Sequence, residues 1–191
     1  MKITKNMLQK LIREEVTAKL VKVAPVVQTD VVPKSNTQLH DAMRNYIASL
    51  RALYLWFHGA HHSAKGTGFV GDHATIFSDI YDQLIGDYDT AVEKAIGFLG
   101  DETMSCPIHV TQDALAILKT HPSPAGKREI EILEGAISFL EEHYNLLTET
   151  YESLEGSDNL PLGLNDYLTG AANEYDTFLY LLKQRVKENM N

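Results

Sequence analysis

Four of the chain's eight histidines fall within sixteen residues, on both sides of a Lys-Gly-Thr-Gly turn at residues 65–68. They are His58, His61, His62 and His73. Imidazole nitrogen is a common ligand of zinc and iron, and two helices joined by a short turn can bring such rings together. The spacing indicates one half of a metal site, although a histidine at a helix end is also commonly a cap or a solvated side chain.

His61 and His73 are the main ligand candidates. His61 lies on the apolar stripe of its segment, where a leucine would be usual, and His73 is in register with Ile76 and Ile80. A single histidine on such a stripe is more often a hydrogen-bonded core residue than a ligand. Two histidines that face each other across a hairpin are a fair half-site for iron or zinc.

Iron also needs oxygen ligands, and Asp89 and Glu93 offer two carboxylates on one helix face. The alternative is a solvated surface stripe, which we expect for Asp82 and Asp87. On a regular helix, Asp89 and Glu93 would lie about 160° and 200° around from His73 and about 24 to 30 Å along the axis. The sequence therefore predicts either no centre or a centre shared between two copies that pack antiparallel about a twofold axis.

Four long segments with helical periodicity must position these residues. Short connections make the first and second, and the third and fourth, antiparallel neighbours, while 101–125 forms a long crossover in which 114–118 could be a short helix. Two hairpins joined by one crossover are the topology of a ferritin-like four-helix bundle, so the predicted fold class is all-α. The predicted helices run from an Asn36 or Thr37 cap to about His62, from near 71–72 to about Gly100, from after 124–126 to about Glu155, and from after Pro161 to about Val186.

The N-terminal segment differs from the bundle. Residues 1–22 have apolar residues near helical spacing, and 23–36 contain Pro25 and Pro33, which oppose helix. We expect an appended amphipathic helix and a linker over 1–36, and the bundle over 37–191.

Charge is unevenly distributed. The chain carries −9, and residues 1–22 carry six lysines and arginines against two glutamates, or +4, which leaves −13 for the rest. A basic terminus can bind a polyanion such as DNA, although a solvated helix face is the simpler explanation. No apolar run reaches the roughly 18–20 residues of a membrane span, and the single Cys106 fits a reducing compartment. We expect a cytoplasmic protein without membrane contact, in a bacterial cytoplasm if it is phage-encoded.

Residues 61–100 resemble the Dps family of mini-ferritins. The family pattern has a histidine before a Lys-Gly turn, a phenylalanine, a second histidine, a tyrosine, and Asp-x-x-x-Glu before a glycine. The matching residues are His61, Lys65, Gly66, Phe69, His73, Tyr81, Asp89, Glu93, and Gly97 or Gly100. The last segment is similar at Asp166, Leu168, Asp176 and Tyr180, so that the resemblance covers about residues 37–187.

The resemblance implies a hollow dodecamer of twofold dimers that oxidises Fe(II) with peroxide or oxygen and stores the ferric product. His61 and His73 would come from one chain, and Asp89 and Glu93 from its twofold mate, with zinc as a possible non-native occupant. Family members that bind DNA often use basic N-terminal tails, which points to residues 1–22 as a DNA contact.

The sequence departs from this pattern around the second histidine. The acidic ligand expected four residues after His73 falls on Phe77, and Asp79 lies close by. The interval from His73 to Asp89 is one residue longer than is usual, which predicts a bulge in this helix.

A second departure follows the first histidine. His62 replaces the usual tryptophan, so His62 and Asp79 are candidate substitute ligands. His58 precedes His61 and His62 by three and four residues and is a weaker candidate. Two alternatives to a ferroxidase remain at this point: a DNA-binding or scaffold oligomer with an altered metal site, and a small-molecule or zinc-binding bundle that does not turn over iron.

Overall fold

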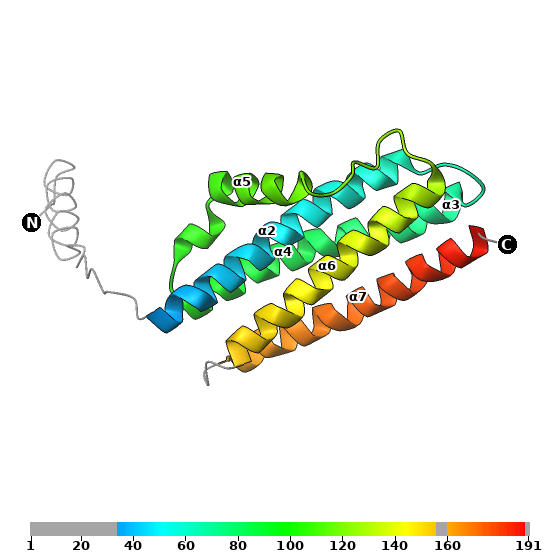
Figure 1. The fold of residues 1–191 in the computed structure, drawn as a ribbon. Coiled ribbons are helices and arrows are strands. Elements are labelled where there is room, and N and C mark those ends of the chain that lie inside the picture. The colour runs from blue at the N-terminus through cyan, green and yellow to red at the C-terminus, as the bar shows by residue number, and fades with distance from the viewer. Residues whose placement is uncertain (1–33, 156–159, 190–191) are drawn as a thin grey trace, which may run out of the picture. The chain divides into compact units, whose positions relative to one another are not determined.

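The computed structural model describes residues 34–155 and 160–189, with side chains from Thr37 to Glu188. Every regular element in these ranges is a helix, which confirms the all-α fold class (Figure 1). The elements are α2 (Lys34–Ser63), α3 (Phe69–Gly71), the π-helix η1 (Asp72–Ile76), α4 (Phe77–Leu99), the 3₁₀ helix η2 (Glu102–Ser105), α5 (Pro107–Leu118), α6 (Glu129–Glu155) and α7 (Leu162–Asn189). The predicted helix over 1–22 and residues 23–33 of the predicted linker lie outside the described residues. Residues 34–36, predicted as the end of the linker, are instead the first residues of α2.

The four long helices form the predicted bundle. α2 packs against α4 and α6, α6 packs against α7, and α7 also contacts α4. The crossover carries the short helix α5, which packs along the outer side of α2 (Figure 1). Large side chains without solvent exposure fill the centre, among them Tyr46, Phe57, Phe77, Phe139 and Tyr175.

Local sequence signals explain where the helices end. Gly100 closes α4 in the left-handed conformation, with φ of 69°, and donates its N–H to the carbonyl of Ile96 at 2.8 Å. Pro107 opens α5 at a position where a helix needs no N–H donor. Glu129 and Glu131 place negative charge in the first turn of α6.

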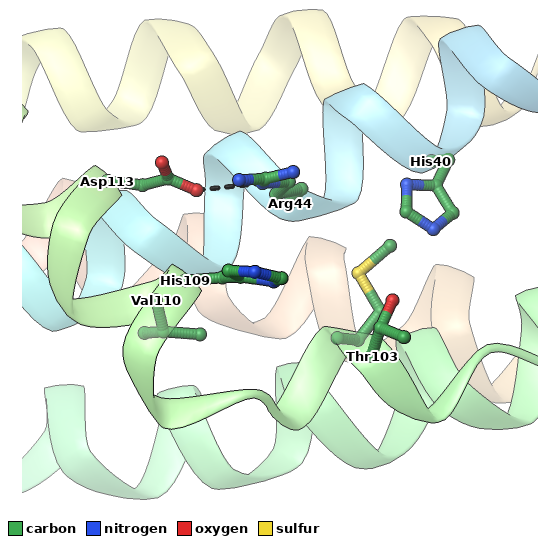
Figure 2. Close-up of a pocket in the computed structure, with 7 residues that line it drawn as sticks. His40, Arg44, Thr103, His109, Val110 and Asp113 are labelled. Carbon is green, nitrogen blue, oxygen red and sulfur yellow. Dashed lines mark hydrogen bonds and ion pairs between the residues drawn. The ribbon is translucent and has the colours of Figure 1, made fainter.

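The crossover is fastened to α2 by charged side chains. The Arg44 Nε donates to an Asp113 carboxylate oxygen at 2.7 Å, from α2 to α5 (Figure 2). His40 hydrogen-bonds to Asp101, and this contact, together with hydrogen bonds from Thr103, lowers the pKa of the Asp101 carboxyl to about 2. His109 lies beside Arg44 in the same view. These contacts hold the first part of the crossover and α5 against α2. No helix in the described ranges is long and apolar enough to cross a membrane.

Candidate metal centre

The turn between α2 and α4 is built around two glycines. Gly66 has a φ of 89°, a conformation that other residues rarely adopt. At Gly68, a Cβ would lie 1.4 Å from a guanidinium nitrogen of Arg185. A side chain at position 66 would strain the backbone, and one at position 68 would displace the Arg185 guanidinium. The turn returns the chain so that His73 faces His61.

His61 and His73 hold each other through reciprocal hydrogen bonds. The His61 Nδ1 donates to the carbonyl of His73 at 2.7 Å, and the His73 Nδ1 donates to the carbonyl of His61 at 2.8 Å. Because a carbonyl oxygen can only accept, both Nδ1 atoms must carry the proton. In its neutral form, a ring that donates through Nδ1 keeps an unprotonated Nε2 with a lone pair, which is the form that binds a metal.

The electrostatic surroundings favour the neutral imidazole. Partial burial lowers the pKa of His61, the hydrogen bond to the His73 carbonyl opposes this change, and the neighbouring histidines lower the pKa further. A ligand that is already neutral loses no proton when a cation binds to it.

Aromatic rings frame the pair. The His61 and His73 rings are stacked, with centroids 3.8 Å apart and planes at 20°. Phe69 stacks on the other side of His73 at 5.0 Å, and the edge of Tyr81 meets His61 at 5.2 Å. The two imidazoles are thus fixed in orientation by packing as well as by hydrogen bonds.

The remaining nitrogen candidates form a separate pair next to this one. The Nε2 atoms of His58 and His62 are 3.3 Å apart. The rings of His61 and His62 meet edge to face at 4.9 Å. Asp79 is exposed, and Phe77 is buried in the core against Phe57, with ring centroids 6.2 Å apart. Phe77 therefore serves packing at the position where the family pattern has an acid.

The predicted bulge is confirmed as the π-helix Asp72–Ile76, in which the N–H of Phe77 bonds to the carbonyl of Asp72. A π-helical turn holds one residue more than an α-helical turn. Every later residue therefore lies about 100° less far around the helix axis from His73 than it would on a regular helix. The angles predicted for a regular helix are therefore wrong. With the bulge, Asp89 and Glu93 lie about 60° and 100° around from His73, on the same half of the helix.

Asp89 and Glu93 remain far from the histidines within one chain. Both side chains are exposed, and the helical rise places them about 24 and 30 Å along the axis from His73. In the described part of the chain, no group of three or more histidine, cysteine or acidic side chains could hold a metal ion. A single chain thus brings together the nitrogen half of the predicted centre and leaves the carboxylate half apart from it.

Sequence reasoning missed the ion-pair cluster that fastens the π-helix. Asp72, with a side chain 2% exposed, accepts from Arg185 of α7 at 2.8 Å. Arg185 also donates to Glu129 of α6 at 2.5 Å, and Glu129 accepts from the Gly68 N–H. Burial raises the pKa of Asp72, and the guanidinium opposes this shift. Asp72 and Arg185 are 113 positions apart, so the sequence alone does not indicate that they form an ion pair.

A second polar group is buried inside the bundle. Asp87, expected on the surface, is 5% exposed and accepts from the Tyr175 hydroxyl at 2.6 Å, whereas Asp82 is exposed as expected. His143 is 1% exposed, and its Nδ1 hydrogen-bonds to the Ser49 hydroxyl at 2.8 Å. The position of Asp87 on the apolar stripe, three residues after Leu84, was the available signal for its burial.

The bundle is similar to several solved structures. Dps from Vibrio cholerae O1, described as a member of a broad superfamily of ferritin-like diiron-carboxylate proteins, superposes with a TM-score of 0.67 over 85% of this chain and 99% of its own, at 17% identity. Dps from Mycobacterium smegmatis gives a TM-score of 0.63 over 78% and 81%, at 20% identity. A histidine-to-glycine mutant of Listeria innocua Dps gives 0.64 over 78% and 95%, at 17% identity.

The chain has the Dps fold. Its amino-acid sequence matches no family model and no curated protein, so the likeness rests on the arrangement of the helices. Within this fold, the hairpin of α2 and α4 brings His61 and His73 together.

Proposed function

We propose that this chain is a Dps-like ferroxidase and iron-storage protein, whose substrate is Fe(II) and whose oxidant is peroxide or oxygen. The observation that carries the proposal is the reciprocal hydrogen bonding of His61 and His73, which uses the Nδ1 atom of each ring and leaves each Nε2 lone pair for a metal. Metal-binding histidines typically donate their other ring N–H to a carbonyl in this way.

The oxygen ligands would come from a twofold-related copy. Antiparallel packing of α4 against its mate would bring Asp89 and Glu93 of one chain to the histidines of the other, with His61 within about 5 Å of a partner carboxylate. Two exposed apolar side chains support this contact surface: Leu55, one turn before His58, and Ile85, one turn before Asp89. Large apolar side chains on a monomer's surface often mark an interface.

The chain's residues would bind and orient iron, and iron would supply the redox chemistry. Peroxide takes one electron from each of two ferrous ions and, with two protons, leaves as two waters. His61 and His73 would hold the cation by nitrogen, and the partner's carboxylates would balance its rising charge during oxidation. The net charge of −9 suits an assembly that gathers cations and nucleates a ferric mineral.

By analogy with the fold, the assembly would be a dodecamer of twofold dimers in the cytoplasm, where it limits oxidative damage. Zinc would be a non-native occupant of the iron centre. Of the supplementary candidates, Asp79 is exposed and belongs to the proposed ligand set only if a partner approaches it.

The test is anaerobic loading with Fe(II) followed by peroxide, on the wild type and on His73→Ala, with ferric absorbance and oligomer mass measured together. We expect rapid oxidation in the wild type, with iron eluting with a large oligomer. His73→Ala should lose this activity, because the loss of even an outer partner of a metal ligand typically costs about 10–100-fold. His109→Ala, which removes an exposed histidine from α5, is the control. Equal rates in all three proteins would refute the proposal.

The alternative is a DNA-binding or scaffold oligomer on the same fold, and the +4 charge of residues 1–22 favours it. Removal of residues 1–22 should then abolish retention of DNA, and retention by the whole chain should weaken steeply with salt. If the chain forms an oligomer, does not oxidise iron, and loses DNA retention when the N-terminal segment is removed, the DNA-binding or scaffold function would be supported.

A further inference from the structure

A second pair of histidines stands beside the proposed iron centre. His58 and His62 are four residues apart near the end of α2, and neither takes part in the hydrogen bonds that join His61 to His73. We propose that His58 and His62 bind a second divalent cation, of the zinc class, at a site separate from the iron centre. This site does not depend on the proposed ferroxidase function.

The separation of the two ring nitrogens fits one cation. The Nε2 atoms of His58 and His62 are 3.3 Å apart. Zinc binds imidazole nitrogen at about 2.0–2.1 Å in tetrahedral geometry, which puts two such nitrogens about 3.3–3.4 Å from each other. Without metal, one ring N–H donates to the lone pair of the other ring, and a cation would take the place of that proton. Histidines at i and i+4 on a helix are a known zinc-binding arrangement.

Neighbouring rings hold the pair in this geometry. His58 stacks on Tyr54, with centroids 5.8 Å apart and planes at 10°, and it meets the edge of Tyr81 at 5.1 Å. His62 meets the edge of His61 at 4.9 Å. Ligands that are oriented before the metal arrives lose less freedom when it binds.

The ligand chemistry selects the class of cation. Within the described residues, His58 and His62 have no third histidine, cysteine or acidic side chain placed to complete a metal site with them. A pair of imidazoles with water in the other positions suits zinc, copper or nickel better than magnesium or calcium, which prefer oxygen. In the single chain, His62 is exposed and His58 is half-buried, so a cation can reach both from solvent.

The experiment is a zinc titration against a chromogenic chelator, on the full chain. All variants carry His73→Ala, which removes one imidazole of the iron centre. His58→Ala, His62→Ala or the control His109→Ala is then added. Circular dichroism verifies folding, and because the exposed His62 is not part of the core, its variant remains informative if His58→Ala unfolds.

We expect the His73→Ala chain to bind zinc and the His58 and His62 variants to bind it at least about tenfold more weakly, since each removes one of two direct ligands. The His109 variant should match its parent. An affinity unchanged by His58→Ala or His62→Ala would overturn the site, as would loss of all zinc binding through His73→Ala alone. The iron-oxidation assay uses chains with His58 and His62 intact, so its failure would leave the zinc result standing.

Discussion

Histidine occupies two contrasting environments in this chain. His61 and His73 each donate a hydrogen bond from Nδ1 to a backbone carbonyl. Their Nε2 atoms remain available at a partly solvated helix end. His143 lies in the bundle, stacked on Tyr46 at 5.3 Å, with Tyr175 meeting it edge to face at 5.1 Å. The hydrogen bonds of His61 and His73 orient two rings that could bind a metal, whereas burial of His143 disfavours its protonated, charged form.

The buried imidazole predicts an acid-sensitive fold. Burial lowers the pKa of His143 to about 3, from an ordinary value of 6.5. Below pH 6.5 the unfolded chain takes up a proton at His143 that the folded chain does not. The free energy of unfolding should therefore fall by about 1.4 kcal/mol for each pH unit between pH 6.5 and about pH 3. His143→Gln, which cannot be protonated, should lose this contribution when guanidinium unfolding is compared at pH 7.5 and 5.5. An undiminished pH dependence in the variant would show that other groups cause it.

Removal of the Arg185 guanidinium should strongly destabilise the hairpin. The Asp72 carboxylate would remain buried without its partner, at a cost of about 3–5 kcal/mol. We expect Arg185→Met to lower the denaturation midpoint far more than Arg128→Met, because Arg128 bonds Glu131 at the surface. Equal effects of the two substitutions on urea unfolding would argue against the role of the cluster.

At the scale of elements, the π-helix decides which way His73 faces. It absorbs one residue between the turn and α4, so that His73 and Asp89 share one side of the helix in spite of their longer interval. The Asp72–Arg185 ion pair fastens this segment to α7 and holds it in place.

Changing the length of the π-helix tests this register. Deletion of the exposed Thr75 should give a regular α-helix and keep His73 in register with Asp89, so folding and iron oxidation should persist. Insertion of one alanine after Thr75 should turn His73 by about 100° relative to Asp89 and abolish oxidation. Helix content from circular dichroism and peroxide-dependent oxidation rates provide the readouts. Activity in the insertion variant, or its loss in the deletion variant, would contradict the register assigned here.

The helices and the histidine pair were predictable because they depend on local periodicity and on one short turn. The extra residue before Asp89 was visible as an unusual interval, and it was correctly interpreted as a bulge. The reciprocal bonding of His61 and His73 was not predictable, because it depends on the path of the backbone through the turn. The links from Asp72 to Arg185 and from Asp87 to Tyr175 join residues 113 and 88 positions apart, which no periodicity reveals.

At the scale of the whole molecule, each proposed centre takes its nitrogen ligands from one chain and its oxygen ligands from another. The rise of α4 keeps Asp89 about 24 Å from His73 in one chain, so the proposal requires a second copy. A chain that lacks His73 could still lend its carboxylates to a neighbour. A chain that lacks Asp89 could still lend its histidines.

The most direct test is therefore to mix His73→Ala and Asp89→Ala chains by co-expression and to measure peroxide-dependent Fe(II) oxidation. Each variant alone should be inactive, and the mixture should recover about a quarter of the wild-type activity. Random pairing makes half the dimers hybrid, and each hybrid has one of its two centres intact. A mixture of His61→Ala and His73→Ala chains, in which no centre keeps both imidazoles, should stay inactive. If the first mixture remained as inactive as its components, the shared centre would be contradicted.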